Sequence, residues 1–170
     1  MEFLKLAADR YSVRKFDPRP VEDEVLAKVL KAGHLAPTAV NFQPQKIYVI
    51  KSEEAMEKVR DCTPCHFGAP IMLMICHDTN TCWKRSFDGK SSGDIDASIV
   101  ATHMMLQAAE LGLGTTWVMF FDSAKLSEVF ALPENIVPTA LMPLGYPAAD
   151  AEASEKHAVC RSEEELVITL

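Results

Sequence analysis

Apolar residues recur at helical spacing in five stretches of the 170-residue chain. The strongest pattern lies between residues 94 and 111, a stretch that is apolar almost all round. We expect a central buried helix there, ended by Gly112, with His103 as a hydrogen-bonded core residue. The other predicted helices cover residues 2–9, 22–35, 53–59, where Ser52 would be the cap, and 123–130.

Runs of β-branched, aromatic and other apolar residues between these helices predict strands. Because helices and strands are interleaved, the pattern favours an α+β fold over a helical bundle, in a single domain of residues 1–170. The last apolar run could pair with its own sheet or with the sheet of a partner. The predicted strands cover residues 46–51, 69–76, 115–121, 136–144 and 166–170.

Composition narrows the class of protein. Hydrophobic residues make up 48% of the chain, which is an ordinary globular content. The net charge of −7 argues against non-specific nucleic-acid binding, which needs a basic surface. No apolar run has the length of a membrane span, and the N-terminus lacks the layout of a signal peptide. We therefore expect a cytoplasmic protein whose five cysteines are reduced.

Arg10, Ser12 and Arg14 alternate near the N-terminus. In an extended segment their side chains project to one side. Two guanidinium groups and a hydroxyl suit a dianionic phosphate, because arginine can bind its oxygens bidentately. Such a run standing alone is more often a solvated strand edge.

A second polar segment, residues 36–44, reads Ala-Pro-Thr-Ala-Val-Asn-Phe-Gln-Pro. Prolines, small residues and two side-chain amides would let this segment approach a flat polar ring closely. By itself, such a segment is commonly only a turn.

Together, these two segments resemble the nitroreductase family of flavoproteins. That family opens with Arg-x-Ser-x-Arg/Lys-x-Phe and continues with Ala-Pro-Ser-x-x-Asn-x-Gln-Pro. Thr38 stands where the family usually has Ser, and it keeps the hydroxyl. The resemblance continues through Gly112-Leu113-Gly114-Thr115-Thr116-Trp117, Leu144-Gly145-Tyr146-Pro147 and Arg161.

The resemblance implies a central, mainly antiparallel sheet flanked by helices, in an intertwined homodimer that binds FMN. NAD(P)H would give a hydride to flavin N5, and a nitroaromatic, quinone or related electron-poor acceptor would then take electrons from the same face. Because the cofactor carries this chemistry, we expect no catalytic side chain and no metal. The expected partners are NAD(P)H, a small-molecule acceptor and a second copy of the chain, with no nucleic acid and no membrane.

The resemblance also implies which residues bind FMN. The alternating N-terminal set and a late arginine would hold the phosphate. The Pro/Asn/Gln loop would meet the isoalloxazine ring or the ribityl chain from the partner subunit, so that the site would exist only in the dimer. The implied cofactor-binding residues are Arg10, Ser12, Arg14, Pro37, Thr38, Ala39, Asn41, Gln43, Trp117, Met119, Phe120 and Arg161.

The chain departs from the family pattern at Met119 and Phe120, where the family commonly has a small Gly-Ala pair. The substitution leaves the backbone N–H donors in place. The two side chains would either narrow the substrate face or point into the core. A narrowed face would also suit a flavin-binding carrier or sensor without turnover, which is the alternative function.

Cys62-Thr63-Pro64-Cys65-His66 has the spacing Cys-x-x-Cys-His. Structural or surface thiols are the commonest explanation. A redox dithiol, a zinc site completed by His77 and Cys82, and haem attachment are the other interpretations. A thiol or metal module is therefore a third candidate function.

Overall fold

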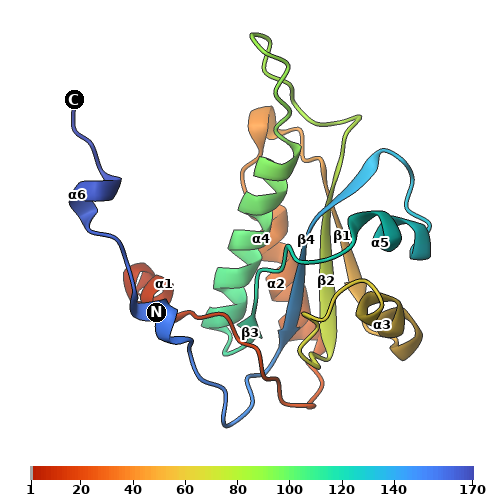
Figure 1. Cartoon of the computed structure of the whole chain (residues 1–170), viewed down its shortest axis with the longest axis vertical. Coiled ribbons are helices and arrows are strands. Elements are labelled where there is room, and N and C mark those ends of the chain that lie inside the picture. Colours follow the sequence, from red (N-terminus) through yellow and green to blue (C-terminus); the bar gives the residue numbers. More distant parts are fainter. Residues whose placement is uncertain (1) are drawn as a thin grey trace.

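The computed structural model describes residues 2–170, which contain a four-stranded antiparallel sheet in the order β1-β2-β4-β3 (Figure 1). Helices and strands are interleaved along the chain, as the predicted α+β fold requires. The elements are α1 (Phe3–Asp9), α2 (Asp23–Leu35), the 3₁₀ turn η1 (Ala39–Asn41), β1 (Gln45–Ile50), α3 (Glu53–Arg60), β2 (Ile71–Asp78), α4 (Gly93–Glu110), β3 (Gly114–Thr115), α5 (Ser123–Val129), β4 (Ile136–Gly145), the 3₁₀ turn η2 (Glu155–Ala158) and α6 (Glu163–Leu166).

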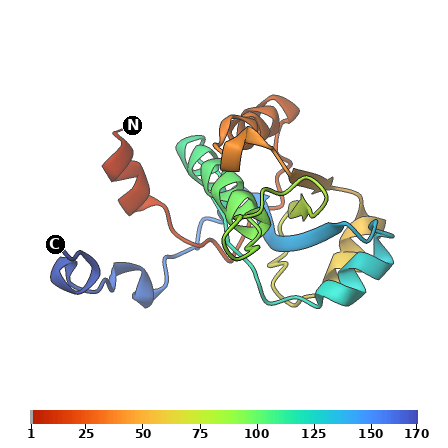
Figure 2. The same cartoon turned by 90° about the horizontal axis from the view of Figure 1, so that it is seen from above.

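β2 packs against helices on both faces of the sheet. Leu73 and Ile75 join the apolar cluster that α2 and α4 contribute to, whereas Met72 and Met74 join the cluster of α3 and α5. All four side chains are 0% exposed. Side chains alternate between faces along a strand, so a strand covered on both sides is apolar throughout. Figure 2 shows the two helix layers on opposite sides of the sheet.

Most predicted elements are confirmed within a few residues of their ends. The Ser52 cap of α3 is also confirmed, since the Ser52 hydroxyl accepts the Ala55 N–H at 3.3 Å. Glu53 and Glu54 occupy the first turn, where the helix dipole favours carboxylates.

The predicted strand over residues 115–121 is wrong beyond its first residue. β3 contains only Gly114–Thr115, and Val118 forms one isolated bridge with Leu141. The Phe121 N–H then donates to the Met119 carbonyl at 3.1 Å, which turns the chain toward α5. An apolar run does not encode this turn, because the turn depends on where the pairing with β4 stops.

α4 is buried on one face and exposed on the other. Ala97, Val100 and Met104 are 0% exposed and lie against α2 and the sheet. Ile95 is 51% exposed, and His103 is exposed as well. The prediction of a helix buried on all sides, with His103 in the core, is therefore wrong for a single chain. The exposed face of α4 carries Ile95 beside the polar side chains of Asp94, Thr102 and His103.

The two ends of the chain lie together, apart from the sheet (Figures 1 and 2). A ring nitrogen of His157 lies 3.0 Å from the Ala8 carbonyl, and the Tyr11 hydroxyl donates to the Ala151 carbonyl at 3.3 Å. Residues 152–170, here called the C-terminal arm, are exposed throughout.

The predicted terminal strand over residues 166–170 is also wrong. Residues Glu163–Leu166 form α6, at whose N-terminus the Ser162 hydroxyl accepts the Glu165 N–H at 3.3 Å. Three consecutive glutamates suit the N-terminus of a helix. Within residues 2–170, the chain beyond α6 pairs with no strand. None of the described helices has the length and hydropathy needed to span a lipid bilayer.

Candidate functional site

Residues 10–16 run extended beside β3, which positions the first predicted site segment. Ser12 bridges Thr115, and the Val13 N–H donates to the Thr115 carbonyl at 3.0 Å. The Val13 side chain is 2% exposed and packs on Gly114, where an added Cβ would lie 2.6 Å from it. Since Val13 faces inward, alternation directs its two neighbours outward.

The two arginines of this segment are available to an anion. Arg14 is exposed and donates to the Ser12 carbonyl at 3.2 Å. Among the described residues, neither Arg10 nor Arg14 forms an ion pair. Lys15, in contrast, pairs with Asp150 at 2.8 Å, and this contact raises the pKa of Lys15. Two unpaired guanidinium groups next to a hydroxyl fit a phosphate group.

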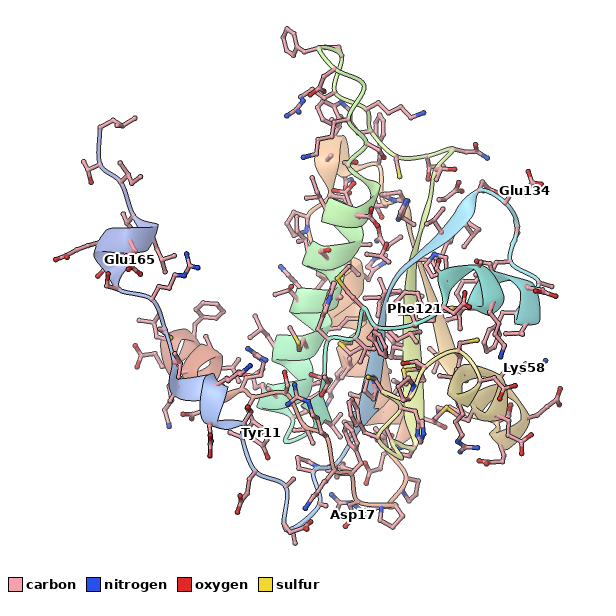
Figure 3. All side chains as sticks on the ribbon, viewed as in Figure 1. Tyr11, Asp17, Lys58, Phe121, Glu134 and Glu165 are labelled. Carbon is pink, nitrogen blue, oxygen red and sulfur yellow. The ribbon has the colours of Figure 1, made fainter. Side chains whose placement is uncertain are left out.

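A pocket of about 170 Å³ adjoins this segment at the end of α4. Arg10, Tyr11 and Val13 line one side of it, and Ala109 of α4 lines the other. Tyr11, labelled in Figure 3, marks the place of the segment below α1 and beside α4. The segment predicted to bind the phosphate group therefore lies at the C-terminal end of α4.

The second predicted segment, residues 36–44, is a tight loop after α2. Val40, Asn41 and Gln43 have φ angles of 53°, 56° and 52°, in the left-handed region. Non-glycine residues there cost on the order of 1 kcal/mol each, so the surrounding structure must hold them. The Thr38 hydroxyl accepts the Gln43 N–H at 3.0 Å and closes the loop. The side chains of Asn41 and Gln43 are exposed.

Asp96 fixes this loop to the start of α4, although the sequence patterns do not single it out. Its side chain is buried, and its carboxylate accepts the Ala39 N–H at 2.8 Å and the Ser92 hydroxyl at 2.6 Å. A buried carboxylate is costly unless it is hydrogen-bonded in this way. The spacing of Asp96 could have identified it as buried, because it shares a helix face with the buried Val100 and Met104.

The structure does not bring these two segments together within one chain. The loop is hydrogen-bonded to Asp96, whereas Arg10 lines the same pocket as Ala109. Asp96 and Ala109 are 13 positions apart in α4, which is about 20 Å at the rise of an α-helix. Figure 1 shows the loop after α2 and the segment after α1 at opposite ends of α4.

A third predicted segment, residues 117–120, crosses the sheet between β3 and α5. Trp117 is partly buried against the cluster of α2 and α4. Met119 and Phe120 are 69% and 73% exposed, so neither side chain points into the core. Among the described residues, their backbone N–H groups donate to no protein acceptor. Phe121, labelled in Figure 3, follows this exposed pair.

Arg161 lies on the C-terminal arm between η2 and α6 and is exposed. Figure 3 shows the arm, marked by Glu165, standing away from the body of the chain. The single chain does not place Arg161 with the other predicted site residues.

The Cys62–Cys65 loop lies before β2 and is hydrogen-bonded to Phe120 of the exposed Met119–Phe120 pair. The Thr63 hydroxyl donates to the Phe120 carbonyl at 2.6 Å and accepts the Cys65 N–H at 3.0 Å. Cys62 is 6% exposed, and burial raises the pKa of its thiol. A raised pKa disfavours the thiolate that redox exchange or metal binding requires.

The zinc interpretation that joins this loop to His77 and Cys82 is wrong. His77 lies near the far end of β2, about 20 Å from the start of that strand. Burial raises the pKa of Cys82. Among residues 2–170, no group of three or more His, Cys, Asp or Glu side chains has the arrangement to hold a metal ion.

Comparison with known proteins assigns the family. The Nitroreductase family matches residues 7–64 and 63–146 of this chain. The chain belongs to the Nitroreductase family. A family member from Clostridium difficile 630 is 41% identical and superposes with a TM-score of 0.94, with 100% of each chain covered. The resemblance seen in the sequence is thereby confirmed, and so is the antiparallel α+β fold.

Two further relatives connect the Nitroreductase family fold to a cofactor. A Bacillus subtilis protein named FMN reductase (NAD(P)H) is 27% identical over 165 residues, covering 86% of this chain and 66% of that protein. A Desulfovibrio desulfuricans protein, solved in complex with FMN, is 25% identical with a TM-score of 0.85, covering 100% of this chain and 97% of that one.

Proposed function

We propose that this nitroreductase family member is an FMN-dependent NAD(P)H oxidoreductase that works as a homodimer. Its proposed acceptors are nitroaromatic compounds, quinones and related electron-poor molecules. The Bacillus subtilis relative named FMN reductase and the FMN complex of the Desulfovibrio desulfuricans relative support the cofactor.

The separation of the two site segments along α4 carries the proposal. Arg10 and Arg14 offer two unpaired cations at one end, and residues 36–44 offer exposed amides at the other. A second copy related by a two-fold axis would set the loop of one chain against the arginines of its partner. The site would then lie at the subunit interface and would need both chains.

Exposed apolar surface supports the dimer. The C-terminal arm exposes Val159, Leu166 and Ile168 by 75%, 64% and 79%. A single chain does not cover these side chains. Burying them against a second copy would gain about 25 cal/mol for each Å² of apolar area.

FMN, when bound, would supply the hydride and electron chemistry, and the protein would supply binding and orientation. In this proposal Arg10, Arg14 and Arg161 hold the phosphate and Ser12 adds a hydrogen bond. Residues 37–43 meet the ring or the ribityl chain. The unpaired N–H groups of Met119 and Phe120 face the ring edge, and the side chains of that pair narrow the acceptor face in favour of small or flat molecules.

An absorption spectrum of the purified protein tests this proposal, with chromatography of any chromophore released by heat. We expect an oxidised-flavin spectrum, release of FMN, and NAD(P)H oxidation that depends on an added nitroaromatic or quinone. Bound FMN without acceptor-dependent turnover would favour the carrier or sensor instead. A colourless protein that takes up no added FMN would contradict the proposal entirely.

A further inference from the structure

The segment between β2 and α4 forms an ordered hairpin that the site described above does not use. The Arg85 N–H donates to the Lys90 carbonyl at 3.0 Å, and the Ser92 N–H donates to the Trp83 carbonyl at 2.9 Å. Lys84 and Ser91 form a bridge between the two arms. Figure 1 shows this hairpin projecting past the N-terminal end of α4.

A pocket of about 310 Å³ lies between the hairpin and α4. It extends to Ala39 of the loop proposed to face the flavin ring. Trp83 offers a flat apolar wall, and Ile95 and Ile99 form the side of α4. A pocket with an aromatic wall and aliphatic sides suits a planar ring.

The charged side chains that line this pocket differ in whether they already have a partner. The Arg85 guanidinium is occupied by both carboxylate oxygens of Asp88, with one distance of 2.8 Å. Asp96 also lines the pocket, but its oxygens accept hydrogen bonds from Ala39 and Ser92. The Lys90 ammonium forms no ion pair with any described residue. Lys90 is therefore an unpaired cation that lines a pocket suited to a planar ring.

We infer that this pocket binds the electron acceptor and selects planar aromatic molecules that carry an anionic group such as a carboxylate. Trp83 stacks on the ring, and Lys90 pairs with the anion. Ala39 places the pocket next to the loop that would meet the flavin. That the ligand is the electron acceptor therefore rests on the proposed function.

The test compares 4-nitrobenzoate with neutral 4-nitrobenzamide, which have closely similar rings. In the wild-type protein, kcat/KM with NADH should be higher for the carboxylate, and low salt should enlarge the difference. Lys90→Gln should reduce that preference by up to about five-fold, the upper end expected of one exposed ion pair, and leave kcat/KM for the amide unchanged. Lys84→Gln is the matched control, because Lys84 is exposed on the same hairpin and does not line the pocket.

A binding readout separates this inference from the proposed function. Titration of either compound should quench the fluorescence of Trp83 saturably, and Trp83→Phe should abolish that part of the signal, whether or not the protein turns over. Equal affinity for both compounds, or equal effects of the two lysine substitutions, would overturn the inference. If Lys90→Gln instead lowers only the preference for NADPH over NADH, Lys90 binds the nucleotide and not the acceptor. That result would also overturn the inference. Absence of turnover with both compounds would count against the proposed function alone.

Discussion

At the scale of single residues, the absence of an ion-pair partner among the described residues distinguishes Arg10 and Arg14 from Lys15, the third cation of the same segment. Lys15 already has a carboxylate partner in Asp150, whereas the two arginines have none among the described residues. An alternating Arg-x-Ser-x-Arg run predicts the common face but not which cations are free. That information comes from residues that lie 135 positions away in the sequence.

Replacing either arginine should therefore weaken FMN binding. Arg10→Ala or Arg14→Ala removes a charge-assisted contact worth about 1.5–3 kcal/mol, which corresponds to roughly 10- to 100-fold in the dissociation constant. Lys15→Ala is the control and should bind FMN as the wild type does. Quenching of FMN fluorescence measures all three constants, and wild-type affinity in both arginine variants would rule out the phosphate assignment.

Asp96 is the residue that the sequence patterns missed. It should affect FMN binding by supporting the loop of residues 36–44. Asp96→Asn weakens the hydrogen bonds to Ala39 and Ser92, so the left-handed residues of the loop lose part of their support. We expect roughly ten-fold weaker FMN binding and a lower Tm, since each bond to a charged group contributes about 1.5–3 kcal/mol. Asp94→Asn, on the exposed side of the same helix turn, should change FMN binding little. A Tm loss without any change in FMN affinity would assign Asp96 a purely structural role.

At the scale of elements, periodicity predicted those helices and strands whose partners lie within the chain. β2 and β4 are covered on both faces, and α2 and α3 each pack one apolar face against this chain's own core, so their apolar patterns match their burial. The errors concern α4, the run at 166–170 and the strand predicted over 115–121, which ends after Thr115. α4 and the run at 166–170 carry apolar residues without a partner in the same chain, and a sequence pattern does not say which molecule will cover them.

The C-terminal arm should act in association rather than in folding of the chain. Val159, Leu166 and Ile168 are exposed, so replacing all three by Asp should leave the far-ultraviolet circular dichroism spectrum unchanged. The same change should weaken dimerisation by roughly 100-fold or more if a second copy buries these side chains. Light scattering after size exclusion measures the effect, with Ala153→Asp on the same arm as the control. A triple variant that dimerises normally would show that the arm does not form the interface.

At the scale of the whole molecule, the proposed FMN site requires two chains. One chain holds an arginine-rich segment and an amide-rich loop about 20 Å apart along α4, and two-fold symmetry would create two equivalent sites from these four halves. The motifs predicted both halves, but the distance between them appears only in the folded chain. The proposed function therefore depends on the claim that two chains share each FMN site.

Complementation between two defective variants tests that claim most directly. The first variant is Arg14→Ala, and the second is the loop variant Asn41→Ala/Gln43→Ala; each alone should bind FMN weakly. After co-refolding of equal amounts, half of the dimers should be mixed, and each mixed dimer should contain one site with both halves intact. FMN titration should then recover roughly a quarter of the wild-type sites at wild-type affinity. If both variants dimerise and bind FMN weakly but mixing recovers no sites, each FMN site takes its arginines and its loop from the same chain, and the shared site is ruled out.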